Sequence, residues 1–454
     1  MKVRKKIRIA ISVCIICICA LFLVKHYDSK EYTINNKQEY INKVCEMSGV
    51  PAMSIAVWDG DTEMYLNYSK NGELVNEHTL YELASTTKAF TALGILQLKE
   101  QGMLDYSDPV QQYIPEFHPT YKGNEVNITI EQLLNHTSGI PSYALNLIPE
   151  EPYNPGGLSQ SLSKLYNIKL IFTPGSRFDY STVNYDFLAL IIENVTGLEF
   201  EKYIELHILD ELEMTNSFFR RDYIQKNVTQ GYKPAFLCTI PFNAPVYYGN
   251  TAAGYLISNT NDLMKWMKNV KMLFDFSSFP IDSDNIYFAG WGVLDDFVCH
   301  SGENPNYSSY VIIDKNEDIG VFALSSKTGV NAPVVADGLY RILKGESIKI
   351  DFHGLYFDYL EYQDLLFIIA PLLLVYIILW IPVDSKKRAI IRIMISVIII
   401  CGLSLYPIIS HNSYRFTFIW KPGSFAFLIG FSLLCAFYLM MKSIIYIKKH
   451  QMKK

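Results

Sequence analysis

The chain has 454 residues, half of them apolar, and a formal net charge of −5. This length exceeds that of one ordinary hydrophobic core and predicts two or three structural units. The small net charge gives no sign of a nucleic-acid partner, and the high apolar share indicates membrane segments.

The first apolar segment lies close to the N-terminus. Residues 1–6, MKVRKK, carry four positive charges and precede an apolar run at 7–24. That charge order is typical of a signal segment. Because no A-x-A cleavage site closes the run, we predict an uncleaved signal anchor at 7–24 with a cytoplasmic N-terminus at 1–6. A cleaved signal peptide is the alternative.

The next part of the chain, residues 25–354, is polar and mixes strand and helix patterns. AMSIAVWD and TEMYLNY alternate like paired strands around the turn signal Asp59-Gly60-Asp61. A helix is predicted from Ser85 to Gly102, where the glycine ends it. Later, NIYFAGWGVL, YSSYVIID and IGVFALSS look like three successive strands, and VVADGLYRILKG looks like a closing helix.

Ser85-Thr86-Thr87-Lys88 stands at the start of this predicted helix. Residues three apart share a helix face, so the Lys88 amine can reach the Ser85 hydroxyl. The free N–H groups at a helix N-terminus favour developing negative charge, and burial can lower a lysine pKa as a general base requires. Taken alone, the motif also fits a serine that caps a helix beside a solvated lysine.

Three more apolar runs, at 365–383, 393–409 and 423–441, are each about long enough to cross a bilayer. The loop Asp384–Arg388 and both ends of the chain are basic, so the positive-inside rule places them in the cytoplasm. The sequence therefore predicts a multi-pass protein of the cell membrane, with the lipid bilayer as a partner. Residues 25–354 lie on the extracytoplasmic side, and 442–454 form a cytoplasmic tail.

The eight cysteines do not predict a disulfide framework or a zinc site. Only Cys45, Cys238 and Cys299 fall outside the apolar runs, and their spacing matches neither pattern. His118, His136 and His300 also lack ligand spacing. We expect no metal and no cofactor.

Further motifs follow Ser85-Thr86-Thr87-Lys88 in a fixed order. They are IEQLLNHTSGI at 130–140, PGSRFDYSTVNY at 174–185, TAAGYLIS at 251–258, and Trp291-Gly292 before His300-Ser301-Gly302. Together these motifs resemble the serine β-lactamase and penicillin-binding protein superfamily, in its class C branch (peptidase family S12 type). The branch includes class C β-lactamases, D-alanyl-D-alanine peptidases, D-amino-acid peptidases and related esterases.

The resemblance covers about residues 37–345 and implies a two-lobed α/β fold. One lobe is an antiparallel sheet packed with helices, the other is mostly helical, and the active site lies between them. Here a transmembrane helix bundle would follow. The resemblance also implies that Ser85 attacks a carbonyl to form an acyl-enzyme, that Lys88 shares in taking its proton, and that Tyr180, from the family's Y-x-N element, serves as general base or proton relay.

The remaining site residues come from the strand motif. His300-Ser301-Gly302 matches the family's K-T-G element, in which many members of this branch carry His. The family's oxyanion hole would correspond to the backbone N–H groups of Ser85 and Glu303. Lys327-Thr328-Gly329 spells K-T-G literally, but it ends the next predicted strand, so we assign the motif to His300.

Two positions depart from the family pattern. Thr182 replaces the asparagine of Y-x-N, which in the family helps to hold the lysine and the substrate amide. Glu303 stands where small residues are usual, and its carboxylate would disfavour substrates that end in a carboxylate there, unless it points to solvent. Both departures weaken an assignment as a β-lactamase or a D-alanyl-D-alanine carboxypeptidase.

The sequence thus predicts a membrane-bound serine hydrolase, a peptidase or amidase that acts on D-amino-acid-containing peptides or acyl-amino-acid small molecules. The substrate is either a cell-wall peptide or an N-acyl-D-amino-acid prodrug, because colibactin-type prodrug-activating peptidases are similar to this chain in having three transmembrane helices after the hydrolase domain. An esterase or β-lactamase of the same fold is one alternative. A catalytically silent penicillin-binding-like sensor is another.

Overall fold

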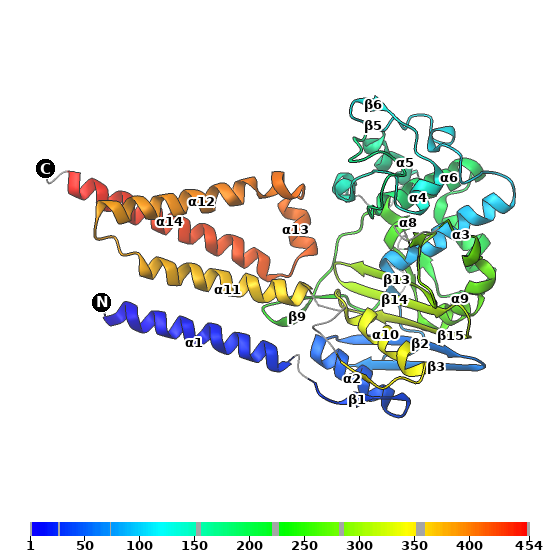
Figure 1. Cartoon of the computed structure of the whole chain (residues 1–454), viewed down its shortest axis with the longest axis horizontal. Coiled ribbons are helices and arrows are strands. Elements are labelled where there is room, and N and C mark those ends of the chain that lie inside the picture. The colour runs from blue at the N-terminus through cyan, green and yellow to red at the C-terminus, as the bar shows by residue number, and fades with distance from the viewer. Residues whose placement is uncertain are drawn as a thin grey trace. The chain divides into compact units, whose positions relative to one another are not determined.

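The computed structural model describes residues 2–25, 28–72, 74–150, 156–219, 227–280, 286–350 and 359–451. It forms two compact units (Figure 1), one made of Met1–Asp28, Lys233–Ile240 and Asp358–Lys454, and the other of Ser29–Tyr232 and Pro241–Phe357. Residue 1 of the predicted N-terminal segment, the predicted domain end at 354 and residues 452–454 of the predicted tail lie outside the described residues.

The larger unit is built on a seven-stranded antiparallel sheet with the strand order β11-β12-β13-β14-β15-β2-β3. An N-terminal hairpin therefore completes a sheet whose other strands come from much later in the chain. The strands are β2 (Ala52–Asp59), β3 (Thr62–Ser69), β11 (Tyr287–Phe288), β12 (Trp291–Val293), β13 (Phe297–Asn304), β14 (Tyr307–Asp314) and β15 (Ile319–Ser325).

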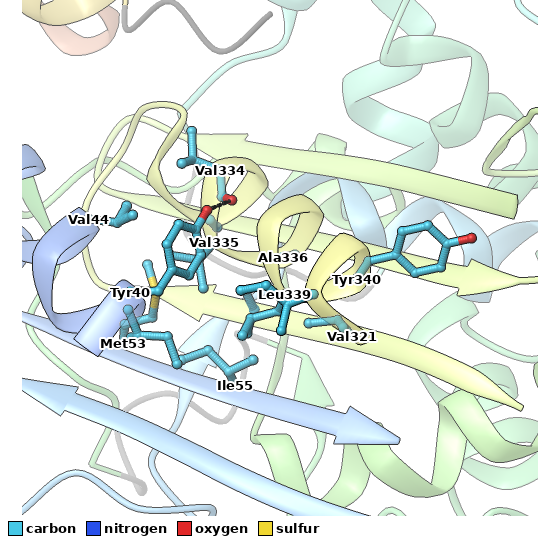
Figure 2. Packing of buried hydrophobic residues seen from close by; sticks show 14 of the residues in the cluster. Tyr40, Val44, Met53, Ile55, Val321, Val334, Val335, Ala336, Leu339 and Tyr340 are labelled. Carbon is cyan, nitrogen blue, oxygen red and sulfur yellow. Dashed lines mark hydrogen bonds between the residues drawn. The ribbon is translucent and has the colours of Figure 1, made fainter. Parts of the chain in front are cut away.

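One face of this sheet is covered by α2 (Lys37–Ser48) and α10 (Asn331–Leu343), as Figure 2 shows. Alternate residues of β2, such as Met53 and Ile55, point into this layer because successive strand side chains face opposite sides. The Tyr40 hydroxyl donates a hydrogen bond of 2.6 Å to the Val334 carbonyl and so ties the two helices together.

The other face carries α9 (Thr260–Leu273), which packs against α3 (Thr87–Glu100). The rings of Phe90 and Trp266 stack with centroids 4.0 Å apart. Met267 approaches the sheet at Gly320, where an added Cβ would already lie 3.5 Å from its sulfur. The helix that follows Ser85 is therefore fixed to the sheet through buried aromatic packing.

Short elements complete the larger unit. The helices are α4 (Ile130–Leu134), α5 (Gly157–Leu162), α6 (Val183–Thr196), α7 (Phe200–Ile204) and α8 (Thr251–Gly254). The strands are β1 (Glu31–Tyr32), β4 (Tyr81–Glu82), β5 (Thr120–Tyr121), β6 (Asn124–Glu125), β7 (Phe218–Phe219), β10 (Leu256–Ser258) and β16 (Ile348–Lys349). The predicted fold class, an antiparallel sheet with helices beside a helical lobe, is confirmed.

The sequence prediction was wrong about NIYFAGWGVL, which is not one strand. Ala289 and Gly290 have φ values of +51° and +81° and form the tight turn that joins β11 to β12. An added Cβ at Gly290 would lie 2.6 Å from the Ala89 nitrogen, so the turn presses directly on the start of α3. Alternation alone could not reveal this contact.

The smaller unit contains α1 (Lys2–Lys25), α11 (Tyr359–Trp380), α12 (Lys386–Ser410), α13 (Tyr414–Trp420) and α14 (Ser424–Gln451). Four of these helices, all but α13, are long and apolar enough to span a membrane. They match the four apolar runs predicted at 7–24, 365–383, 393–409 and 423–441, except that α11 ends at Trp380, three residues short, and α14 begins at Ser424, one residue late. The short helix α13 was not predicted.

A hairpin from the middle of the chain also belongs to this unit. β8 (Tyr232–Ala235) and β9 (Cys238–Pro241) are joined by Phe236 and Leu237, whose φ values are +54° and +59°. Asp364 accepts hydrogen bonds from both of their backbone N–H groups, at 3.0 and 2.5 Å. The buried Lys233 amine donates to the Phe418 carbonyl at 2.7 Å, near the end of α13. A carboxylate thus stabilises a turn that lacks glycine.

Candidate active site

Ser85 lies in the 3-10 turn Ala84–Thr86 (η2) that leads into α3, so the α-helix begins at Thr87, two residues after its predicted start at Ser85. Ala84 has a φ of +49°, an unfavourable backbone conformation for a residue with a Cβ. Hydrogen bonds to the Leu83 carbonyl from Thr86 at 2.8 Å and from Ser309 at 2.5 Å hold the turn. The strained turn leaves the Ser85 side chain partly exposed in an otherwise buried segment.

Lys88 is fully buried, and its Nζ lies 3.0 Å from the Ser85 hydroxyl and 2.7 Å from the Ala253 carbonyl. Burial lowers the pKa of Lys88 from 10.5 to about 7, although the charge of Asp186 acts in the opposite direction. The neutral amine is therefore well populated near pH 7. The i, i+3 spacing read from the sequence does bring the two groups into hydrogen-bond reach.

Tyr180 lies on the other side of this pair. Burial raises the pKa of its phenol, and a hydrogen bond with Ser85 only partly offsets the effect. The Lys88 amine stands 5.2 Å from the centre of the Tyr180 ring. A general base would need a lowered pKa, and the site does not lower that of Tyr180, because an apolar environment disfavours the phenolate.

His136 lies behind Tyr180, with ring centroids 4.2 Å apart. Its Nδ1 accepts a 3.3 Å hydrogen bond from the Ser181 backbone N–H and lies 3.0 Å from the Asn184 side-chain nitrogen. Because a backbone N–H can only donate, the neutral ring carries its proton on Nε2. Burial lowers the pKa of His136 well below its ordinary value, so the ring stays neutral. It positions the segment that carries Tyr180.

His300 projects from β13 and is buried. Its Nε2 lies 2.9 Å from the Tyr287 hydroxyl. Burial, together with the nearby Lys88 charge, lowers the pKa of His300 to about 3. The ring is therefore neutral at physiological pH, unlike the cationic lysine of a K-T-G element. Tyr287 was not singled out in the sequence, since only the β11–β12 turn brings it to His300.

Gly302 allows β13 to approach the backbone of Ser85. An added Cβ there would lie 2.4 Å from the Leu83 carbonyl oxygen and 3.0 Å from the Ser85 nitrogen. The backbone of the strand motif and the backbone N–H of Ser85 are thus neighbours, which is the arrangement that an oxyanion hole needs. Ser301 is exposed. Glu303 is half-buried and accepts a 2.9 Å hydrogen bond from the Thr328 hydroxyl, so it does not simply extend into solvent.

Lys327, from the literal K-T-G sequence, does not belong to the group of site residues around Ser85. It is buried, and its amine donates a hydrogen bond to the Ser48 carbonyl at the end of α2. The residue therefore connects two structural elements. Its neighbour Thr328 reaches Glu303, but the lysine itself does not join Ser85, Lys88 and His300.

Two further residues near the pair escaped the sequence analysis. Asp186, on α6, is fully buried, and within the described part of the chain its carboxylate oxygens have no hydrogen-bond partner. Burial raises the pKa of this carboxyl well above its usual range. Asn250 receives a 3.4 Å hydrogen bond from the Thr182 hydroxyl. Neither residue belongs to a recognisable motif, so no signal in the sequence could have found them.

The comparisons with known proteins identify the family of this chain. A family model described as Beta-lactamase matches residues 38–346, and the chain belongs to this family of β-lactamase-like and penicillin-binding-protein-like serine hydrolases. Protein flp of Staphylococcus aureus (strain NCTC 8325 / PS 47) is 30% identical over 333 residues, which cover 67% of this chain. The chain spans only 66% of the length of that relative.

Solved structures show the same fold. The octameric penicillin-binding protein homologue from Pyrococcus abyssi superposes with a TM-score of 0.58 at 25% identity, over 69% of this chain and 78% of the other. A D-stereospecific amidohydrolase from Streptomyces sp. gives a TM-score of 0.52 at 22% identity, over 64% of this chain and 94% of the other.

Proposed function

We propose that this chain is a membrane-bound serine hydrolase that forms an acyl-enzyme on Ser85, and that it is a peptidase or amidase for D-amino-acid-containing substrates. The observation that carries the proposal is the buried Lys88 amine, 3.0 Å from the Ser85 hydroxyl with a pKa of about 7. A silent binding protein would have no need to keep a lysine buried and neutral against its serine.

The first half of the reaction is acylation. The Ser85 oxygen attacks the substrate carbonyl while its proton passes to the neutral Lys88 amine, and the backbone N–H groups of Ser85 and Glu303 stabilise the oxyanion. The bond to the leaving amine then breaks, and that amine takes a proton from the neutral Tyr180 phenol, which Lys88 reprotonates. Water hydrolyses the acyl-enzyme by the reverse proton path.

The D-amino-acid substrate class is supported by one neighbour, since the Streptomyces protein of the same fold is called a D-stereospecific amidohydrolase. The membrane setting is supported by the four apolar helices. Their flanking basic residues favour a multi-pass arrangement with the hydrolase unit outside the cytoplasm. In that position the enzyme would meet cell-wall peptides or exported N-acyl-D-amino-acid compounds.

The test is mass spectrometry of the full chain in detergent after incubation with N-acyl-D-alanine amides and esters, their L counterparts and β-lactams. We expect an adduct on Ser85 with the D compounds, and none in the Ser85→Ala variant. An adduct from β-lactams alone would favour a β-lactamase or sensor. An equal adduct in Ser85→Ala would place the nucleophile elsewhere and refute the proposal.

A further inference from the structure

The hairpin of β8 and β9 carries apolar side chains on its surface. From Pro234 to Pro241 the sequence reads PAFLCTIP and contains no charged residue. Residues 233–235 of β8 are buried, whereas Phe236 is 51% exposed and Ile240 is 38% exposed. Within the described residues, β9 pairs with β8 alone. An exposed apolar edge of this kind attracts other strands in water, so we expect an apolar partner to cover it.

The turn of this hairpin has an unusual sequence for its conformation. Phe236 and Leu237 have φ values of +54° and +59°, a conformation that two-residue hairpin turns usually give to Asn-Gly. A side chain with a Cβ makes this conformation unfavourable. The two large apolar residues therefore strain the turn, and Phe236 does not gain a place in the core in return, since half of it is exposed. Their presence is explained if the tip itself enters an apolar phase.

The backbone of the turn does not depend on water for its hydrogen bonds. Asp364 accepts from the N–H groups of both turn residues, at 3.0 and 2.5 Å, and it also accepts from the Ser424 hydroxyl. The Pro234 carbonyl accepts a 2.9 Å hydrogen bond from the Gly423 N–H. Pro234 and Pro241 have no N–H to satisfy. A segment in lipid must satisfy its backbone donors within the protein, and this turn does so.

The hairpin contacts the beginnings of two candidate membrane spans. Asp364 lies in the second turn of α11, and Ser424 begins α14. The rings of Phe236 and Phe427 are in contact, with centroids 5.6 Å apart. Phe427 lies about 4–5 Å along the helix axis from Ser424, at 1.5 Å per residue. The Phe236 ring therefore lies beside the first turn of α14, at the level of the apolar run predicted at 423–441.

We propose that the tip of the β8–β9 hairpin is a membrane-binding element, with Phe236 and Ile240 in the hydrocarbon edge of the outer leaflet. The proposal rests on the membrane setting of the proposed function. It adds a lipid contact from the middle of the hydrolase sequence to those of the four long helices. The partner is lipid because the exposed surface of the hairpin continues the apolar surfaces of α11 and α14, which a bilayer would cover.

Photo-crosslinking of the full chain in dioleoyl phosphatidylglycerol nanodiscs tests the position of the tip. p-Benzoyl-L-phenylalanine replaces Phe236 or Ile240, and mass spectrometry identifies the adducts. We expect adducts with lipid acyl chains at both positions. In the matched control the same photoreactive residue replaces Met272, which is 78% exposed on α9, and it should give no lipid adduct. Adducts with a second copy of the chain, or no lipid adduct above the control, would overturn the proposal.

A native cysteine of β9 allows a second measurement that leaves the tip unaltered. Cys238 is exposed, and a maleimide reacts with the thiolate, which an apolar environment disfavours. In nanodiscs, a charged maleimide should therefore label Cys238 at least about tenfold more slowly than Met272→Cys. The double change Phe236→Asn and Leu237→Gly keeps a favourable turn but removes the apolar tip, so it should raise the labelling rate of Cys238. A native rate equal to the control, or a double variant that stays protected, would contradict the proposal.

Cys401 separates this proposal from the membrane setting on which it rests. Cys401 is exposed on α12, within the apolar run at 393–409. If Cys401 reacts as fast as Met272→Cys, α12 is not in the bilayer, and the membrane setting fails together with the proposal. If Cys401 is protected while Cys238 reacts freely, only the hairpin proposal fails. Neither result depends on hydrolysis, which the adduct on Ser85 tests separately.

Discussion

The pH dependence of acylation tests the role of Lys88 most directly. With a pKa of about 7, about half of the molecules carry a neutral amine at pH 7, whereas at the ordinary value of 10.5 about one in 3,000 would. Because only the neutral amine can take the Ser85 proton, the acylation rate should rise about tenfold per pH unit below 7 and level off above it. Replacing Lys88 should abolish this rise with pH, the acid limb of the profile, and most of the acylation rate.

The assay is stopped-flow acylation by a 4-nitrophenyl ester between pH 5 and 9, on the full chain in detergent. We expect Lys88→Ala to slow acylation by at least about 10² and to abolish the limb near pH 7. The control variant Lys99→Ala removes a partly exposed lysine from the same helix. It should keep both the native acylation rate and the acid limb near pH 7. The reasoning is refuted if the native rate climbs without a plateau toward pH 10, or if Lys88→Ala retains the limb.

Four other tests probe the rest of the structure. A charged Asp186 raises the Lys88 pKa, so Asp186→Asn should shift the acid limb of the same profile to lower pH, and an unshifted limb would mean that burial keeps the carboxyl neutral. His300→Ala should lower activity strongly. Lys327→Ala should lower Tm, because its hydrogen bond to the Ser48 carbonyl is lost, but should leave kcat per folded molecule unchanged. A larger loss of kcat in Lys327→Ala than in His300→Ala would exchange their roles. Asp364→Ala should destabilise the hairpin turn by about 1–3 kcal/mol, seen as faster proteolysis at Phe236–Leu237, and equal cleavage would contradict that role. In sealed cells, cysteines at Ser69 and Ser347 should react with an impermeant reagent while those in 384–388 stay protected, and a protected Ser347→Cys would refute the four-crossing topology.

The parts of the site that were predictable from the sequence depend on local spacing. Ser85 and Lys88 are three residues apart, so any helix-like turn brings them together, and the four apolar runs are visible from hydropathy alone. The strand with His300 was placed by its flanking motifs, and the structure puts Gly302 against the backbone of Ser85.

The parts that were not predictable depend on contacts between distant segments. Asn250 meets Thr182 only because α8 is bound to α3, and Tyr287 meets His300 only because two residues with positive φ turn the chain before β12. Asp186 could not be recognised either, since an aspartate on a helix is ordinarily exposed and nothing local indicates that α6 buries it. Hydrophobic periodicity shows which face of a helix or strand is buried. It does not show which other element packs against that face, and the surroundings of these side chains depend on that packing.

Burial assigns opposite tasks to the two proton-handling groups. An environment of low polarity favours the uncharged form of each, so it lowers the pKa of Lys88 and raises that of Tyr180. The resting pair is then an amine that can accept a proton and a phenol that can donate one, both within reach of Ser85. The same reasoning explains why neutral His300 can stand where the family carries lysine, because a permanent cation in this pocket would further lower the Lys88 pKa and compete for the substrate carbonyl. Burial in one apolar site can thus supply both a base and an acid next to Ser85.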